Sequence, residues 1–150
     1  MPYHLKRVRQ PAEWRAMHDI RRAVLFAPDR HDIAYDENHP DDRAEGNTPF
    51  LFFEDDEPVG IVRLDVHGDI AIVRLVAIVA RRQRAGLGRA MDTAVVAEAR
   101  SRGIRILRVN AAADAVGFYE ETGWHKASWN PAELTGIARD AVQMEKLIGA

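Results

Sequence analysis

The feature that most constrains the fold is a pair of glycines where an apolar run meets an amphipathic one. Residues 70–79 are mostly aliphatic and β-branched, which predicts a strand, and a basic segment follows them. Gly86 and Gly88 come next, before apolar residues at three- and four-residue spacing that predict a helix over residues 88–102, ended by Gly103. The first N–H groups of such a helix have no internal partner, so the turn predicts an anion-binding site.

Neither of two familiar phosphate-binding motifs fits this turn. The dinucleotide fingerprint would need Gly or Ala at position 91, which is Met91 here, and the chain has no Gly-Lys-Ser/Thr of a nucleotide-triphosphate loop. A bare Gly-x-Gly after a strand also fits a tight turn that binds nothing. The surrounding elements therefore have to decide between these interpretations.

The rest of the chain predicts a mixed α/β (α+β) fold. Helices are expected where apolar residues recur every three or four positions, at residues 11–25, 88–102 and 115–122. Strands are expected from alternation or short apolar runs, at residues 3–9, 50–53, 59–66, 70–79, 104–110, 124–129 and 140–147. Turns are expected at residues 55–58 and at His67-Gly68, whereas residues 27–49 lack either period and predict a long loop or short irregular helices. The order is an antiparallel meander, a βαβ unit and closing strands.

Composition narrows the class of protein. The 150 residues are 47% hydrophobic and 29% charged and include no cysteine, so residues 1–150 are interpreted as one domain without thiol catalysis, thiolate zinc sites or disulfides. The net charge of −2 argues against nucleic-acid binding. Since no apolar run approaches the roughly 20 residues of a membrane span and no export signal is seen, we expect a cytoplasmic protein. The oligomeric state stays open, a homodimer included.

The residues around the glycines resemble the GNAT (Gcn5-related) N-acetyltransferases. Gln83-Arg-Ala-Gly-Leu-Gly88 matches the Gln/Arg-x-x-Gly-x-Gly/Ala signature of that family. Leu75-Val-Ala-Ile78 resembles its fourth strand, while Val109-Asn110 and Ala115-Val-Gly-Phe-Tyr-Glu-Glu-Thr-Gly-Trp124 resemble its fifth strand and the following helix and turn. The resemblance extends over nearly the whole chain and is weakest over residues 27–49.

The resemblance implies a mostly antiparallel sheet flanked by helices and splayed between residues 70–79 and 105–110, where acetyl-CoA would lie. The fourth strand would pair with the pantetheine arm, and N–H groups of the glycine turn would hold the pyrophosphate. The implied cofactor-binding residues are Val76, Ala77, Ile78, Gln83, Arg84, Ala85, Gly86, Leu87, Gly88, Arg89 and Asn110. Two positions depart from the family, which often has Pro at Ala80 and commonly Asn at Ala112. The arginines of the turn either contact the 3′-phosphate or are merely solvated.

Tyr119 matches the tyrosine that lies near the thioester sulfur as general acid in many members of the family. Beside Phe118 it equally fits a core position of a short helix. Proton transfer from a phenol of pKa near 10 to a thiolate of about 8.5 is uphill by roughly 2 kcal/mol, so a hydrogen bond to the leaving sulfur is expected more than full transfer. No Glu lies within residues 70–79, where some members keep one, so the general base is not identified.

The candidate acceptor site combines the loop of residues 27–49 with strand arginines. Acids gather in the loop, at Asp29, Asp32, Asp36, Glu37, Asp41, Asp42 and Glu45, and predict an acidic surface. Arg63, Asp65 and Arg74 would share a sheet face, either as an ion-pair cluster or as a pocket whose arginine binds a carboxylate. The candidate substrate-binding residues are Tyr35, Asp36, Asp41 and Arg74, which together predict a zwitterionic acceptor. The His and acid spacing over residues 31–42 fits no metal-ligand motif, so no metal is expected.

The expected function is transfer of an acetyl group from acetyl-CoA to an amine of a small molecule or peptide, by direct attack in a ternary complex. The absence of cysteine excludes an acetyl-cysteine intermediate. Two alternatives stay open: a non-catalytic acetyl-CoA-binding or sensor domain of the same fold, and an unrelated phosphate-binding α/β domain.

Overall fold

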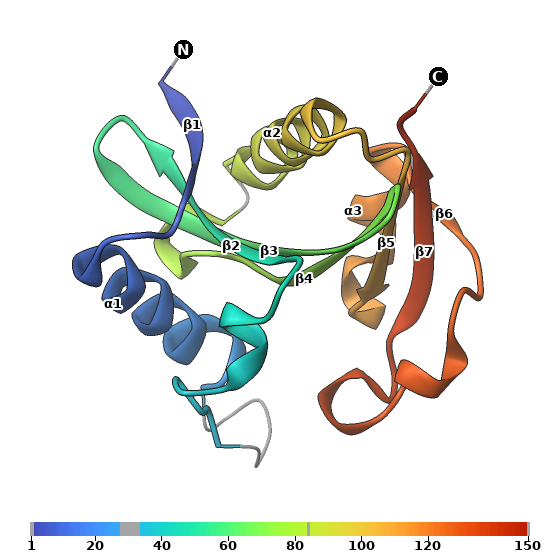
Figure 1. The fold of residues 1–150 in the computed structure, drawn as a ribbon, viewed down its shortest axis with the longest axis horizontal. Coiled ribbons are helices and arrows are strands. Elements are labelled where there is room, and N and C mark those ends of the chain that lie inside the picture. Colours follow the sequence, from blue (N-terminus) through green and yellow to red (C-terminus); the bar gives the residue numbers. More distant parts are fainter. Residues whose placement is uncertain (1, 28–33, 84, 150) are drawn as a thin grey trace.

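The computed structural model describes residues 2–27, 34–83 and 85–149 (Figure 1). Within them one sheet contains seven strands, in chain order β1 (Tyr3–Arg7), β2 (Asn47–Glu54), β3 (Glu57–His67), β4 (Ile70–Ile78), β5 (Ile106–Ala111), β6 (His125–Lys126) and β7 (Val142–Leu147). The α-helices of this part are α1 (Pro11–Ile20), α2 (Leu87–Ser101) and α3 (Val116–Glu121). Every strand and helix expected from the sequence is found, although several ends differ.

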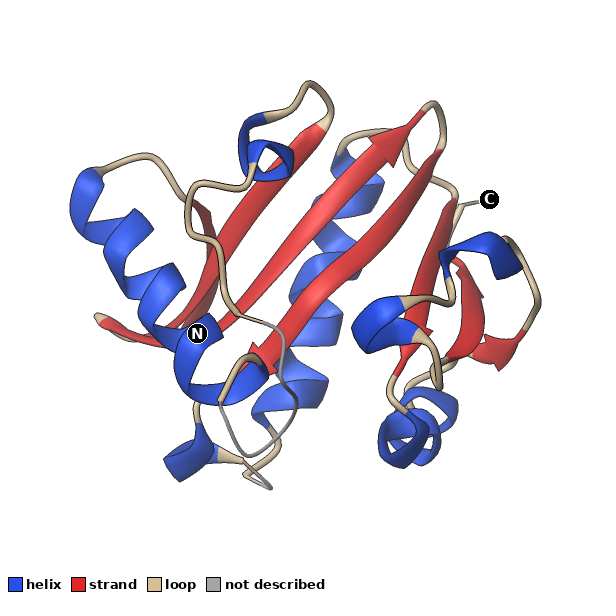
Figure 2. Ribbon diagram, turned by 90° about the horizontal axis from the view of Figure 1, so that it is seen from below, coloured by secondary structure: helices blue, strands red, loops and turns tan. Residues whose placement is uncertain are grey.

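The strand order in the sheet is β1-β2-β3-β4-β5-β7-β6, and β4 with β5 is the parallel pair. Helices α1 and α2 cover opposite faces, so that α1 lies in front of the sheet and α2 behind it in Figure 2. Gly60 of β3 faces α2, since a Cβ placed on it would lie 3.0 Å from the Met91 sulfur. Because side chains alternate along a strand, Arg63 and Asp65 face the α1 side.

Helix α1 begins at Pro11, whose missing N–H costs nothing at a helix start. The Glu13 carboxylate accepts the N–H of Gln10 at 2.7 Å and closes the first turn. The helix then continues as a π-helical turn, Arg21–Leu25, as expected for a helix over residues 11–25. None of the described helices combines the length and apolar character needed to cross a membrane.

The β3–β4 turn lies one residue later than the sequence suggested. His67 pairs with Ile70, so Gly68 and Asp69 form the turn, with Gly68 at φ +64°. The expected turn at His67-Gly68 is therefore wrong, because the glycine supplies the positive φ at the first central position. Moving the turn by one residue moves the register by two, which leaves every side chain on its predicted face. Arg63 and Arg74 are directly paired and do share a face with Asp65.

The expected splay between β4 and β5 is confirmed. The two strands pair only from Ile70 opposite Ile106 to Val73 opposite Val109, after which they diverge (Figure 2). Two residues after Val73, Leu75 has φ +53°, and the register against β3 shifts between Ile61 and Arg63. This bulge bends β4 away from the ladder and leaves its second half without a strand partner on the β5 side among the described residues. We call the point where the ladder ends the fork.

Two other expected segments are corrected. The closing strand expected at residues 124–129 shrinks to β6, because the Gln143 side chain, not a strand, accepts the N–H groups of Trp129 and Asn130 at 3.0 and 2.9 Å. The loop expected at residues 27–49 is shorter, since β2 already begins at Asn47. A 3₁₀ turn η2, Pro40–Arg43, precedes it.

Candidate active site

The glycine turn opens helix α2 as expected. Gly86 is the N-cap residue at φ +81°, and a Cβ placed on it would meet nothing within 4 Å. No side chain of the described residues caps the helix, whose first internal hydrogen bond runs from the Ala90 N–H to the Gly86 carbonyl at 3.1 Å. The N–H groups before Ala90 are thus left to face solvent or a ligand.

Gly88 has a different reason to be glycine. A Cβ on it would lie 3.1 Å from Cε1 of Phe118, so Gly88 lets α3 pack against the start of α2. This contact brings the helix that carries Tyr119 beside the glycine turn. The turn is also bound back to β4, because Nε2 of Gln83 donates to the Ile78 carbonyl at 2.9 Å.

The other residues implied for the cofactor lie along the same path. Val76 and Ile78 are half-buried and Ala77 is buried on the unpaired part of β4. Ala85 and Arg89 are exposed, Leu87 is buried in the core, and Arg84 lies outside the described residues. The nearby arginines Arg81 and Arg82 are ion-paired with Glu57 and Glu54 of the β2–β3 hairpin.

Tyr119 occupies a position that suits both of its predicted roles. Its ring is 8% exposed and packs edge-on against Phe118 and Trp124, with centroid distances of 5.3 Å in each case. Its hydroxyl has no hydrogen-bond partner within the described part of the chain. Burial, with a smaller effect of the Asp92 charge, raises the pKa of Tyr119 above its ordinary value, so the phenol stays protonated.

A chain of ion pairs, which we call the charge chain, crosses the α1 face of the sheet. It begins at Arg21, whose two Nη atoms donate to Asp42 of η2 at 2.7 and 2.9 Å. Asp42 also accepts from Arg63 at 3.1 Å, and Arg63 forms a bidentate pair with Asp65 at 2.7 and 3.0 Å. All four side chains are buried. Among the buried side-chain nitrogen and oxygen atoms of the described residues, Arg21 Nε is the one that has no hydrogen-bond partner.

The charge chain ends at the fork. Arg74 donates from Nε to Asp65 at 2.8 Å and from both Nη atoms to Glu133 at 3.0 Å. Glu133 belongs to the 3₁₀ turn η5, Pro131–Glu133, between β6 and β7. Its carboxylate also accepts Nδ2 of Asn110 at 3.0 Å, while Asn110 Oδ1 accepts Nε2 of Gln143 at 3.0 Å. The Asn110 side chain, implied as a cofactor contact, is thus engaged inside the protein.

The charges of this chain support one another. Burial raises the pKa of the Asp42 carboxyl, but hydrogen bonds and charges from Arg21 and Arg63 outweigh burial, and its pKa is lowered overall. The pKa of Glu133 is likewise lowered, since Arg74 and Asn110 outweigh the burial that would raise it. The structure thus contains the ion pairs of the cluster that Arg63, Asp65 and Arg74 were expected to form, and binding of an acceptor carboxylate by Arg74 stays a prediction.

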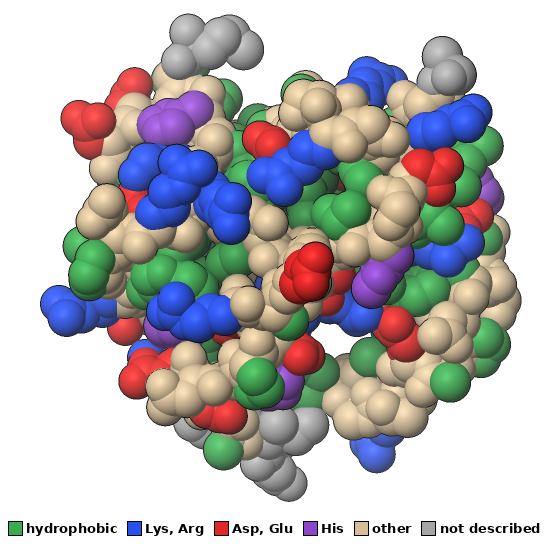
Figure 3. All heavy atoms as spheres, in the orientation of Figure 1, with side chains coloured by type: hydrophobic (Ala, Val, Ile, Leu, Met, Phe, Trp, Pro, Cys, Tyr) green, Lys and Arg blue, Asp and Glu red, His purple; other side chains and the backbone are tan. Residues whose placement is uncertain are grey.

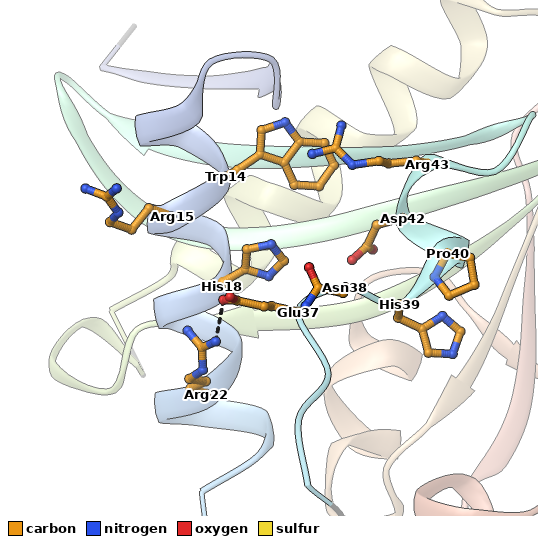
Figure 4. A pocket seen from close by; sticks show the side chains of 10 residues that line it. All are labelled: Trp14, Arg15, His18, Arg22, Glu37, Asn38, His39, Pro40, Asp42 and Arg43. Carbon is orange, nitrogen blue, oxygen red and sulfur yellow. Dashed lines mark hydrogen bonds and ion pairs between the residues drawn. The ribbon is translucent and has the colours of Figure 1, made fainter.

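A hollow of about 330 Å³ lies between α1 and residues 37–43 (Figure 4), and the candidate acceptor residues Tyr35, Asp36 and Asp41 are not among the residues that line it. Tyr35 is half-buried, and its hydroxyl contacts Nδ1 of His18 and accepts Nη1 of Arg21 at 3.2 Å. Asp36 is exposed and accepts the Asn38 N–H at 2.9 Å. Burial raises the pKa of Tyr35 and lowers that of His18, so both groups are uncharged near neutral pH.

Asp41 is exposed beside His39, and its neighbour Asp42 is the buried acid of this segment. Glu37 is paired with Arg22, as the dashed line in Figure 4 marks. The acidic surface expected from the loop is therefore only partly formed in the residues described, Asp29 and Asp32 lying outside them. In Figure 3 acidic and basic side chains are interspersed over the visible face.

Sequence analysis missed Asp42 and Glu133 as site residues. Nothing in the local pattern separates Asp42 from Asp41, because the η2 turn decides which carboxylate points inward. Glu133 follows Pro131 in a loop and has no periodicity to place it. The available signal was indirect: two arginines in strand interiors require carboxylates, and Asp65 alone cannot satisfy both.

Comparison with known proteins identifies relatives of this chain. Its sequence matches the family model of the acetyltransferase (GNAT) domain over residues 30–148. The structure of ribosomal-protein-S18-alanine N-acetyltransferase from Escherichia coli has a TM-score of 0.75 to it at 21% identity, covering 99% of this chain and 95% of that one. An acetyltransferase of the GNAT family from Staphylococcus aureus Mu50 has a TM-score of 0.76 at 10% identity, covering 97% and 99%.

A third similar structure is a complex with ligands. N-acetylglutamate synthase from Neisseria gonorrhoeae, complexed with coenzyme A and L-arginine, has a TM-score of 0.68 at 16% identity and covers 99% of this chain but 34% of that one. No curated protein sequence matches this chain. At these identities the structural similarity shows the fold.

Proposed function

The chain belongs to the acetyltransferase (GNAT) domain family, and from this premise we propose that it is an acetyl-CoA-dependent N-acetyltransferase acting on a small-molecule or peptide amine. The observation that carries the proposal is a continuous path of three parts. The unpaired half of β4 leads into the Gly86 turn, and Gly88 packs this turn against the helix of Tyr119. An open strand edge, an anion-binding helix start and a hydrogen-bond donor are what a thioester of coenzyme A needs.

The residues present fit acetyl-CoA. The left-handed conformation of Gly86 and the open space where its Cβ would be allow close approach of a diphosphate to the first N–H groups of α2. The residues that would hold the cosubstrate are the main chain of residues 76–78, Gln83, Arg84 and the turn of residues 85–89. Because the Asn110 side chain is engaged by Glu133 and Gln143, its main chain is the part left for contact.

The chain's own groups supply the rest of the chemistry. When bound, acetyl-CoA provides the activated acetyl group. The raised pKa of Tyr119 keeps its hydroxyl protonated, so it acts by donating a hydrogen bond to the leaving sulfur. By resemblance to the family, the acceptor amine attacks the thioester directly, and the absence of cysteine from the sequence excludes an acetyl-cysteine intermediate. A primary amine of pKa near 10.4 must first lose a proton, which costs about 4 to 5 kcal/mol at pH 7.

The test is an acetyl-CoA titration followed by a turnover assay. Isothermal titration should show saturable binding of acetyl-CoA, and an amine panel of polyamines, amino acids, amino acid amides and short peptides should contain substrates that release CoA. Binding without CoA release from any amine would indicate the sensor domain instead. Failure to bind acetyl-CoA would refute the cosubstrate assignment.

A further inference from the structure

We propose that Glu133 is the group that receives the acceptor amine, and that it selects amines with no carboxylate beside the amino group. The inference rests on the proposed function, because it names the class of acceptor at that site. It differs from the zwitterionic acceptor that the sequence predicts, in which Arg74 would bind the acceptor carboxylate.

The position of Glu133 is the first argument. The β4–β5 ladder ends at Val73 and Val109, and the next residue on each strand is Arg74 and Asn110. Glu133 accepts hydrogen bonds from both side chains, so its carboxylate spans the fork on the α1 face. The fork is where the unpaired part of β4, the proposed thioester path, begins. A group bound at Glu133 is therefore beside the reacting end of that path.

The second argument concerns Arg74, whose two Nη atoms both point at Glu133 and whose Nε points at Asp65. Glu133 thus already fills the bidentate position that an acceptor carboxylate would occupy. Further along the charge chain, Arg63 and Arg21 are engaged in the same way by Asp65 and Asp42. Three arginines face three carboxylates, and a fourth carboxylate would add an unpaired negative charge next to Glu133.

The third argument is that Glu133 still has capacity for a donor. Its Oε2 accepts one hydrogen bond, from Arg74, and the side chain is 22% exposed. A carboxylate can accept about four hydrogen bonds in all. An amine N–H can therefore bind Glu133 without breaking its bonds to Arg74 and Asn110, which hold the carboxylate in place.

Glu133 acts here by orienting the amine. Its lowered pKa keeps it ionised at neutral pH, which makes it a steady hydrogen-bond acceptor and a poor store for a proton. The amine nitrogen forms the new N–C bond while the C–S bond breaks, and one amine proton ends on the released thiol. The exchange balances without a further reactant.

The test uses substrate pairs that differ only in the carboxylate. CoA release is measured for glycine against glycinamide and for L-alanine against L-alaninamide, with rates expressed per unprotonated amine because the amide form has the lower amine pKa. The variants are E133Q, which keeps the shape of the side chain, and E145Q as the matched control. Glu145 pairs with Arg108 at 2.8 Å on the same sheet face, with side-chain exposures of 18% and 27%, close to the 22% and 27% of Glu133 and Arg74.

We expect the wild-type protein to use each amide with a kcat/KM at least about 10-fold above that of the free amino acid, because like charges oppose one another at the fork. E133Q should lower kcat/KM for the amides by roughly 10- to 100-fold and bring the amide-to-acid ratio near one, with acetyl-CoA affinity unchanged. E145Q should keep the wild-type ratio.

Three results would overturn the inference. They are a preference for the free amino acids, an unchanged ratio in E133Q, and a panel in which acetyl-CoA binds but neither amide is acetylated. An unchanged ratio in E133Q, or a failure to acetylate either amide, leaves the family and cosubstrate assignments unaffected. If the wild-type protein does not bind acetyl-CoA, the proposed function itself is refuted.

Discussion

The two faces of the sheet are built from different chemistry. On the α2 side, cross-strand neighbours such as Leu64 and Val73 are apolar and buried. On the α1 side, the corresponding pairs are Arg63 with Arg74 and, further along, Arg108 with Glu145. The α2 face gains stability from removing apolar surface from water. The α1 face instead carries the six side chains of the charge chain, which are ion-paired one to the next from the end of helix α1 to the fork: Arg21, Asp42, Arg63, Asp65, Arg74 and Glu133.

The comparison indicates that the apolar α2 face mainly stabilises the fold, whereas the charged α1 face mainly fixes the positions of polar side chains. Buried ion pairs repay little of their desolvation cost, and well-packed apolar residues often replace them without loss of stability. A row of bidentate contacts does fix where each carboxylate lies, which apolar packing cannot do for a polar group. At the end of the charge chain, such contacts fix the positions of Arg74 and Glu133 at the fork.

The largest expected effect comes from breaking the charge chain at its most buried carboxylate. Replacing Asp42 by Ala leaves Arg21 and Arg63 without their shared partner, and we expect the free energy of unfolding to fall by about 3–5 kcal/mol. Urea denaturation measures it. Exposed Asp41→Ala is the matched control and should change stability by less than about 0.5 kcal/mol. Equal effects of the two substitutions would show that the charge chain is not a buried unit.

Tyr119, which lies on the α2 side, should respond in the opposite way, because its substitution should lower turnover but not stability. Tyr119→Phe removes a hydroxyl that has no partner in the described residues and keeps the ring between Phe118 and Trp124. We expect kcat to fall roughly 10- to 1000-fold with acetyl-CoA affinity nearly unchanged. Steady-state kinetics and titration with acetyl-CoA measure the two quantities. Wild-type turnover in a stable Phe variant would make Tyr119 a core residue only.

The same contrast explains how far sequence reasoning reached. Each strand and α-helix of the described residues was predicted, because apolar periodicity records which side of an element is buried. The shared face of Arg63, Asp65 and Arg74 was also predicted, and it survived the misplaced β3–β4 turn because strand alternation has a period of two. Local patterns thus sufficed wherever neighbours in the sequence decide the structure.

The partners across the fork could not be predicted in this way. Glu133 is 59 positions from Arg74 in the sequence, and a 3₁₀ turn brings it there. Likewise the backbone of η2 directs the Asp42 side chain into the protein and leaves that of Asp41 exposed, although the two aspartates are adjacent in the sequence. Gly88 was interpreted as part of the phosphate cradle, but its packing against Phe118 depends on where α3 lies. Each of these contacts depends on long-range geometry that a single sequence does not encode locally.

The smallest expected effect compares the acid sensitivity of the two faces. The pKa of Glu133 is lowered in the folded protein, so its contribution to stability is complete above the unfolded pKa and is lost as pH falls through the folded value. E133Q has no carboxyl to titrate at this position, so its free energy of unfolding should fall less steeply on acidification. Because Glu133 is partly exposed, we expect the stability lost between roughly pH 5 and 3 to differ between the two proteins by only about 0.5–1 kcal/mol.

Leu64→Ala, on the apolar face, is the control. It should lower the free energy of unfolding by about 2–5 kcal/mol at every pH, so that its pH dependence is parallel to that of the wild type. If the free energy of unfolding of E133Q also ran parallel to that of the wild type over this pH range, Arg74 would not lower the pKa of Glu133. The claim that this ion pair holds the Glu133 carboxylate at the fork would then be wrong.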